Sequence, residues 1–223
     1  MGRRFALIVF ALVAASVLSI GTLVARPHET HNFHYMFLVW NLFLAWVPLG
    51  AAYFAFTLAR QGIGARVGAL LVVWLLFFPN APYVLTDFKH LHEPGHGHAP
   101  LWYDALMLTS FAWTALMLGF TSLYLVHAIV VRRVRTSVGW VAVVCVLGLS
   151  SFGIYLGRFA GFNSWDVFAH PQIFLSGVRQ DLHSLLHEPK MLAALLALTA
   201  FLFVGYLVVY AFAALRLEPE TAR

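Results

Sequence analysis

Six long apolar runs dominate the sequence, and each is close to or above the roughly 20 residues needed to cross a bilayer. They cover residues 5–25, 35–59, 67–86, 101–131, 138–159 and 191–215. Charged residues make up only 10% of the chain, against about 25% in a soluble domain. So few charges exclude an ordinary soluble enzyme, a disordered protein and a coiled coil. Because the runs are continuous rather than alternating, we predict an all-α membrane protein with a single bundle of about six transmembrane helices.

The first run also has features of a signal peptide, because the basic segment 1–4 precedes it. Its apolar part exceeds the roughly 7–15 residues of a signal sequence. Cleavage after Ala25 would place the bulky Leu23 where a small side chain is preferred. We therefore interpret this run as a retained span. No internal repeat is evident, and residues 1–223 are predicted to form a single transmembrane domain.

The distribution of Lys and Arg predicts the orientation of the bundle. One side holds nine of them: Arg3, Arg4, Arg60, Arg66, Arg132, Arg133, Arg135, Arg216 and Arg223. The other side holds five: Arg26, Lys89, Arg158, Arg179 and Lys190. Both termini are thus predicted in the cytoplasm of a multi-pass protein of the inner membrane. The net charge of +5 is scattered between apolar runs, which fits membrane topology and a lipid partner rather than a nucleic-acid groove.

Residues 172–188, in the last outer connection, have an amphipathic pattern. Apolar residues such as Ile173, Val178 and Leu182 alternate with a face that carries Arg179, His183 and His187. The segment is too short and too polar to span a membrane. Its spacing predicts a short interfacial helix lying at the outer surface.

Polar residues near the outer ends of four segments share one depth in the predicted bundle. They are Asn41, Asn80, Asp87, His90, Asp104, Arg158, Asn163 and Asp166. Polar groups in hydrocarbon are costly, so their placement carries information. Wetting of helix ends would explain any one of them, but the inner half of the bundle offers nothing comparable. We therefore expect these side chains to converge in a ligand-binding site in the outer leaflet.

The segment 77–83, Phe-Phe-Pro-Asn-Ala-Pro-Tyr, interrupts the third run. Pro79 and Pro82 lack N–H groups and disfavour helix in the residue before each, which predicts a kink or an unwound turn. Broken helices of this kind line binding sites in transporters. The alternative is a simple proline kink capped by Asn80.

Arg158 and Asp104 each allow two interpretations. An arginine near a helix end can extend to the membrane interface, or it can pair with Asp87, Asp104 or Asp166. We predict the ion pair. An acidic residue in the first turn after Pro100 is favoured by the helix dipole alone, and it could also belong to the charged site.

The chain is rich in histidine, and ten of its eleven histidines fall in outer segments. Asp87 and His90 are spaced to share one helical face, so a divalent metal at this pair is a candidate cofactor. The tract 92–98 is typical of weak metal binding without catalysis. No His-Glu-x-x-His motif is present, and the predicted outer position conflicts with the cytosolic histidines of membrane desaturases. The single Cys145 excludes a cysteine zinc module.

A string of motifs between Phe37 and Phe174 resembles an uncharacterised family of bacterial integral membrane proteins, known only as a domain of unknown function. The matching segments are residues 39–48, 79–91, 101–104, 155–158 and 163–166. The resemblance implies a polytopic bacterial membrane protein and supplies no activity. The family pattern has a basic residue shortly before the Asn-Ser-Trp-Asp motif, where this chain has Gly161 and Phe162, and it lacks the histidine tract.

Two classes of function follow. The first is an outer-leaflet site that binds a metal, a lipid head group or a small polar ligand, with or without catalysis. The second is a transporter or a non-catalytic partner in a membrane assembly. A transporter is expected to carry polar groups through the full depth of the bundle, so the one-sided distribution favours the first class. The sequence names no reaction, because it has no nucleophile–base motif, phosphate loop or cofactor fingerprint.

Overall fold

The computed structural model describes residues 2–26, 35–92, 99–160, 172, 175–179 and 187–215. Within these ranges it contains no strand, and it has six helices long and apolar enough to cross a membrane, so the predicted fold class is confirmed. Four spans are single helices: α1 (Gly2–Val24), α2 (Met36–Ala59), α5 (Leu101–Val131) and α9 (Pro189–Ala214). The span Thr136–Arg158 consists of α6 (Thr136–Tyr155) and the first residues of a π-helical segment. The remaining span, Ala65–Leu91, is built from α3 (Ala65–Phe77), α4 (Asn80–Tyr83) and the 3-10 segment η2 (Val84–His92).

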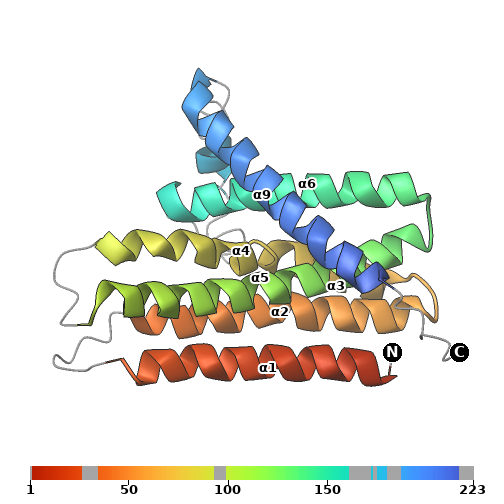
Figure 1. Ribbon diagram of the computed structural model, residues 1–223. Coiled ribbons are helices and arrows are strands. Elements are labelled where there is room, and N and C mark those ends of the chain that lie inside the picture. Colours follow the sequence, from red (N-terminus) through yellow and green to blue (C-terminus); the bar gives the residue numbers. More distant parts are fainter. Residues whose placement is uncertain are drawn as a thin grey trace, which may run out of the picture.

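The chain crosses the bundle back and forth, and Figure 1 shows α1 beginning and α9 ending at the same end of the molecule. We call the opposite end, where α1 and α6 end and α2 and α5 begin, the Asp87 end. The end where α1 begins and α9 ends is called the termini end. Among the residues predicted to form an interfacial helix, 172, 175–179 and 187 are helical. Glu188 is extended and precedes α9, and the remaining residues of the segment lie outside the described residues, so that helix remains a prediction.

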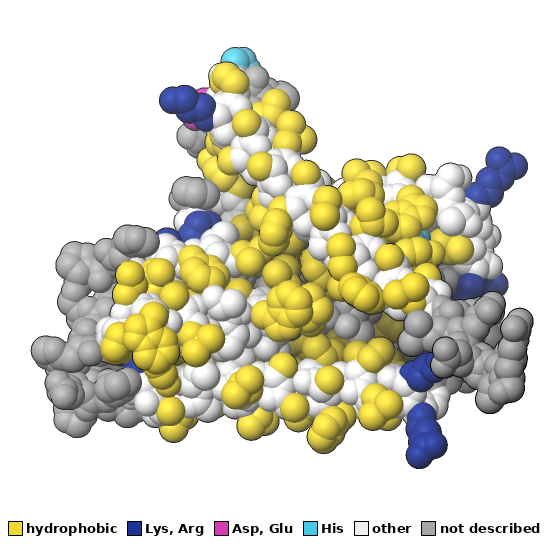
Figure 2. All heavy atoms as spheres, viewed as in Figure 1, with side chains coloured by type: hydrophobic (Ala, Val, Ile, Leu, Met, Phe, Trp, Pro, Cys, Tyr) yellow, Lys and Arg dark blue, Asp and Glu magenta, His cyan; other side chains and the backbone are white. Residues whose placement is uncertain are grey.

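Helix α5 forms the centre of the bundle. It contacts α1, α2, α4, η2, α6 and α9, and 67% of the apolar window in this span is buried. The corresponding fractions are 17% for α1 and 11% for α9, so these two helices turn most of their apolar side chains outward. Figure 2 shows this apolar surface as a yellow face over α9 and α6. Such a surface is suited to lipid, because acyl chains are as apolar as the side chains that meet them.

Two glycines let the broken third span lie close to its neighbours. A Cβ on Gly119 of α5 would lie 2.9 Å from the Cβ of Ala81, and one on Gly153 of α6 would lie 3.4 Å from the ring of Pro79. The Pro-Asn-Ala-Pro segment is therefore wedged between α5 and α6. Small residues at helix contacts allow this close approach in membranes, where van der Waals packing replaces the hydrophobic effect.

Candidate functional site

The candidate site forms where two irregular helical segments face each other at the Asp87 end. Helix α3 ends at Phe77, a turn follows at Pro79, and the chain continues as α4 and then as the 3-10 segment η2, which carries Asp87. Opposite, α6 passes into the π-helical segment η3 (Leu156–Ala160), which carries Arg158. The predicted interruption of the third span is thus present. Segments of 3-10 and π-helix inside longer helices often accompany functional sites, because they re-aim side chains.

Asp87 is the centre of a hydrogen-bonded network. Its Oδ1 accepts a hydrogen bond from Arg158 Nη2 at 2.6 Å, and its Oδ2 accepts one from Asn41 Nδ2 at 3.0 Å. The Asp87 side chain is 1% exposed and that of Arg158 is 9% exposed. The carboxylate is therefore withdrawn from water, Arg158 compensates its charge, and Asn41 of another span bonds its second oxygen. This contact bears out the predicted pairing of Arg158 with one of the three candidate carboxylates.

Arg158 is itself shared between three partners. Its Nε donates to Thr86 Oγ1 at 2.8 Å, and the centre of its guanidinium lies 4.8 Å from the centroid of the Tyr83 ring. The planar guanidinium can satisfy a carboxylate, a hydroxyl and an aromatic face at once, which an ammonium cannot. We call the set Asn41, Tyr83, Thr86, Asp87 and Arg158 the Asp87 network.

A second ion pair lies at the same end of the bundle, between α1 and α5. Arg26, just beyond α1, donates from Nε to Asp104 Oδ1 at 2.7 Å and from Nη2 to Asp104 Oδ2 at 3.0 Å. Both side chains are 9% exposed. The hydrogen bonds that Arg26 donates to Asp104 raise the pKa of Arg26, which keeps the guanidinium charged. Nearby, the Tyr103 hydroxyl donates to the carbonyl oxygen of Thr22 at 2.7 Å, so two contacts fix the end of α1 against α5.

A row of rings links the two ion pairs. The guanidinium of Arg26 lies 4.9 Å from the Tyr35 ring centroid, and Tyr35 is 6.3 Å from the Phe37 ring centroid. Phe37 in turn lies 4.9 Å from the ring of His90, which interacts electrostatically with Asp87. The polar residues at this end are therefore arranged as two ion pairs with an aromatic row between them.

The structure places the sequence-predicted site residues in three groups. Asn41, Asp87 and Arg158 come together in the Asp87 network, and His90 lies beside it. Asp104 pairs with Arg26 instead of Arg158. Asn80 donates to the carbonyl oxygen of Phe77 at 3.0 Å, a contact that fits capping of the interrupted helix. The last two predicted residues, Asn163 and Asp166, lie outside the described residues.

The metal prediction rested on Asp87 and His90. Within the ranges that the structure describes, no group of three or more His, Cys, Asp or Glu side chains could hold a metal ion. A metal there would draw on one carboxylate and one imidazole from the chain, and both Asp87 oxygens already accept hydrogen bonds.

The sequence interpretation missed two features. It counted Arg26 only among the charges of a connection, whereas a basic residue directly after one span and an acidic residue at the start of another suggest such a pair. It also expected nothing comparable in the other half of the bundle. There, His127 Nδ1 and the Tyr206 hydroxyl lie 2.8 Å apart, and the residues are 3% and 0% exposed. That expectation was wrong, because Tyr206 sits in an otherwise apolar run and gives no sign of its partner.

The family of the chain follows from a match to a family model. A family model described as "Protein of unknown function (DUF1361)" matches residues 40–205. The chain belongs to this family. The match covers Asn41, Asp87, Asp104 and Arg158, whereas Arg26 precedes it. No curated protein and no solved structure matches the chain.

Proposed function

We propose that this integral membrane protein binds a zwitterionic head group, of the phosphoethanolamine class, at the outer surface of the membrane through the Asp87 network. One observation carries the proposal. Asp87 and Arg158 form a buried ion pair in which each partner is also bonded to a third group, Asn41 for Asp87 and Thr86 for Arg158. Each partner of the pair is therefore also bonded to a neutral polar group, and the pair lies between two irregular helical segments.

The charges of this pair favour a zwitterionic ligand. Breaking a desolvated ion pair by removing one partner is costly, because the remaining charge is left uncompensated. A ligand with both an anionic and a cationic group avoids that cost, since its phosphate can pair with Arg158 while its ammonium pairs with Asp87. Asn41 and Thr86 then keep the protein side chains in place during the exchange.

A single ion is a poorer fit for the same reason. A metal cation at Asp87 would meet the guanidinium of Arg158, whose Nη2 is 2.6 Å from Asp87 Oδ1. A simple anion at Arg158 would meet the Asp87 carboxylate. If a reaction follows binding, Asp87 and His90 are the groups that could accept and donate a proton beside the head group.

The outer position of the site follows from the nine-to-five division of Lys and Arg between the two sides of the sequence. We propose that both termini face the cytoplasm and that the Asp87 end faces out of the inner membrane. Single cysteines at Lys89 and Gln61, both exposed, test this in a Cys145→Ala background. A membrane-impermeant maleimide should label Lys89→Cys in intact cells, and it should label Gln61→Cys only after permeabilisation. The reverse pattern would invert the topology.

Native mass spectrometry of detergent-purified protein tests the binding proposal. The wild type should retain phosphatidylethanolamine. Asp87→Asn should lose it, because an amide cannot compensate the ammonium. The control is Asp104→Asn, the same chemical change in the second ion pair, which should keep it. The absence of retained phosphatidylethanolamine in the wild type, or equal loss in both variants, would contradict the proposal.

Transport is the second candidate, and one observation favours it. Buried polar contacts occur at other depths as well, including Ser19 with Thr114 at 3.2 Å and His127 with Tyr206 at 2.8 Å. A carrier would expose the Asp87 network alternately to the two sides of the membrane. In the Cys145→Ala background, Thr86→Cys should then react with impermeant maleimide from both sides in oriented vesicles. A head-group site in the outer leaflet should react from the outside alone.

A further inference from the structure

The termini end carries a pocket that the proposed function does not use. It lies between the ends of α2 and α5, has room for about 20 Å³ inside, and is partly open to solvent. Its lining consists of Phe56, Ala59, Arg60, Ile129, Arg132 and Arg133. We call it the arginine pocket. A volume of about 10–15 Å³ on this measure holds one water molecule, so only a small group fits inside and the rest of a ligand lies in the open mouth.

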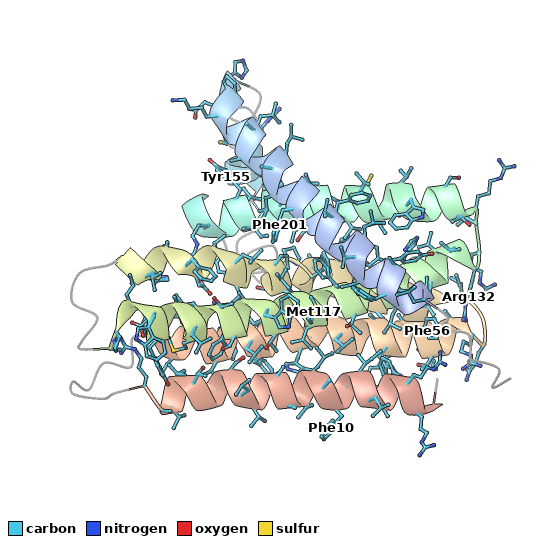
Figure 3. The ribbon with its side chains drawn as sticks, viewed as in Figure 1. Phe10, Phe56, Met117, Arg132, Tyr155 and Phe201 are labelled. Atoms are coloured by element: carbon cyan, nitrogen blue, oxygen red, sulfur yellow. The ribbon has the colours of Figure 1, made fainter. Side chains whose placement is uncertain are left out.

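Two of the three arginines are held in place by neighbouring groups. The guanidinium of Arg132 lies 4.8 Å from the centroid of the Phe56 ring, and Figure 3 shows both residues at this end of the bundle. Arg133 Nη2 donates to the carbonyl oxygen of Ala59 at 2.9 Å, at the end of α2. The positive-inside rule explains an excess of Lys and Arg at the termini end, but it does not require these charges to be fixed around a common pocket.

The pocket has no acidic counterpart in the part of the chain that the structure describes. The described acidic residues are Asp87, Asp104 and Glu188, and all three belong to the Asp87 end. Three guanidinium groups around one pocket repel each other unless an anion lies between them. Guanidinium groups bind phosphate well, because their planar N–H donors match its oxygens.

We propose that the arginine pocket binds the phosphate group of an anionic phospholipid. The pocket lies at the ends of two predicted spans, at the level where head groups meet the apolar part of the bundle. Its arginines surround the phosphate, while Phe56 and Ile129 form an apolar floor that is 6% and 4% exposed. Basic pockets between transmembrane helices are suited to anionic head groups. This site is separate from the Asp87 network and does not depend on its function.

The test compares lipid nanodiscs made of phosphatidylcholine alone with nanodiscs that contain one fifth phosphatidylglycerol. Phosphatidylglycerol should raise the melting temperature of the wild type, and native mass spectrometry should detect retained phosphatidylglycerol. Arg60→Gln, Arg132→Gln and Arg133→Gln should each weaken this binding about fivefold. Arg66→Gln and Arg135→Gln are matched controls, since they remove the same charge at the same end outside the pocket lining.

Each outcome decides the proposal. Selective loss in the three pocket variants supports it. Equal loss in the controls would show a diffuse charge effect, and no preference for phosphatidylglycerol over phosphatidylcholine would also overturn it. Stabilisation by inorganic phosphate or glycerol phosphate to the same extent would assign the pocket to a soluble anion instead of a lipid. Arg60→Gln guards against a folding defect, because no described residue accepts a hydrogen bond from the Arg60 side chain.

Discussion

The two ion pairs at the Asp87 end are built differently. Arg26 and Asp104 meet through two parallel hydrogen bonds of 2.7 and 3.0 Å, which join a planar guanidinium to both oxygens of one carboxylate. Arg158 and Asp87 meet through one hydrogen bond of 2.6 Å, and each turns its remaining donor or acceptor toward a third residue. In the first pair one guanidinium bonds both carboxylate oxygens, whereas in the second the two carboxylate oxygens are divided between Arg158 and Asn41.

The two pairs also differ in the regularity of the backbone that carries them. Asp104 stands in the first turn of a regular helix, where the dipole also favours a carboxylate. Asp87 stands on a 3-10 segment, and Arg158 stands on a π-helical one. The pair with two parallel hydrogen bonds fastens α1 to α5. Because Asp87 divides its oxygens between two partners on irregular segments, we propose ligand binding at this pair and a structural role for the first.

The largest expected effect is the loss of stability in Arg158→Ala. This change leaves the Asp87 carboxylate, which is 1% exposed, without its cation, and an unmatched buried charge costs about 3–5 kcal/mol. Thermal unfolding in detergent should show a strongly lowered melting temperature. Arg158→Lys keeps the positive charge and should be tolerated only in part, because an ammonium cannot bond Thr86 and Asp87 in the same fixed plane. An unchanged melting temperature in Arg158→Ala would mean that the arginine is stabilised by water or head groups.

Neutralising both members of a pair should recover much of that loss. In Asp87→Asn/Arg158→Gln no charge is left unpaired, and we expect a smaller destabilisation than in Arg158→Ala alone. The same double change in the other pair, Asp104→Asn/Arg26→Gln, should also recover stability relative to Arg26→Ala. Double-mutant cycles from thermal unfolding measure both coupling energies. A coupling energy near zero for Asp87 and Arg158 would contradict the buried pair.

Asn41→Ala should have an intermediate effect. It removes a hydrogen bond to a charged acceptor, worth about 1.5–3 kcal/mol. The comparison variant is Asn80→Ala, which removes a hydrogen bond to the neutral carbonyl oxygen of Phe77, worth about 0.5–1.5 kcal/mol. Unfolding measurements should therefore rank Asn41→Ala as the more harmful change. The opposite order would mean that the Asn80 contact in the interrupted helix contributes more to stability than the hydrogen bond to Asp87.

Tyr83→Leu should have the smallest effect. It removes the ring that lies 4.8 Å from the Arg158 guanidinium, an interaction of about 0.5–2 kcal/mol. Tyr83→Phe keeps the ring and should be nearly neutral in the same unfolding assay. If Tyr83→Phe were as harmful as Tyr83→Leu, the hydroxyl and not the ring would be responsible.

The sequence predicted the spans well, because long apolar runs have one common physical cause. The expected run 101–131 and helix α5, Leu101–Val131, have the same bounds. Pro79 also indicated the interruption of the third span. Its missing N–H and the clash of its ring with the preceding turn are local effects, which a sequence reveals directly. The buried partner of Arg158 was also predictable as one of three carboxylates, because an arginine at that depth needs a counter-charge.

The choice between those carboxylates could not be predicted, because it depends on how the helices pack. Arg26 and Asp104 are 78 positions apart, and they meet only because α1 lies against α5. Likewise, the π-helical turn that directs Arg158 toward Asp87 has no sequence signal of its own. The contact of His127 with Tyr206 depends on the packing of α9 near α5, which periodicity does not reveal when both faces of a helix are apolar.

The most direct test of the central claim compares the two pairs in one binding measurement. Short-chain phosphatidylethanolamine, as a soluble probe, is titrated against purified wild type, Asp87→Asn/Arg158→Gln and Asp104→Asn/Arg26→Gln, with the melting temperature as the readout. We predict stabilisation of the wild type and of the Asp104/Arg26 double variant, and none of the Asp87/Arg158 double variant. Equal stabilisation of all three proteins would contradict the assignment of binding to the Asp87 network.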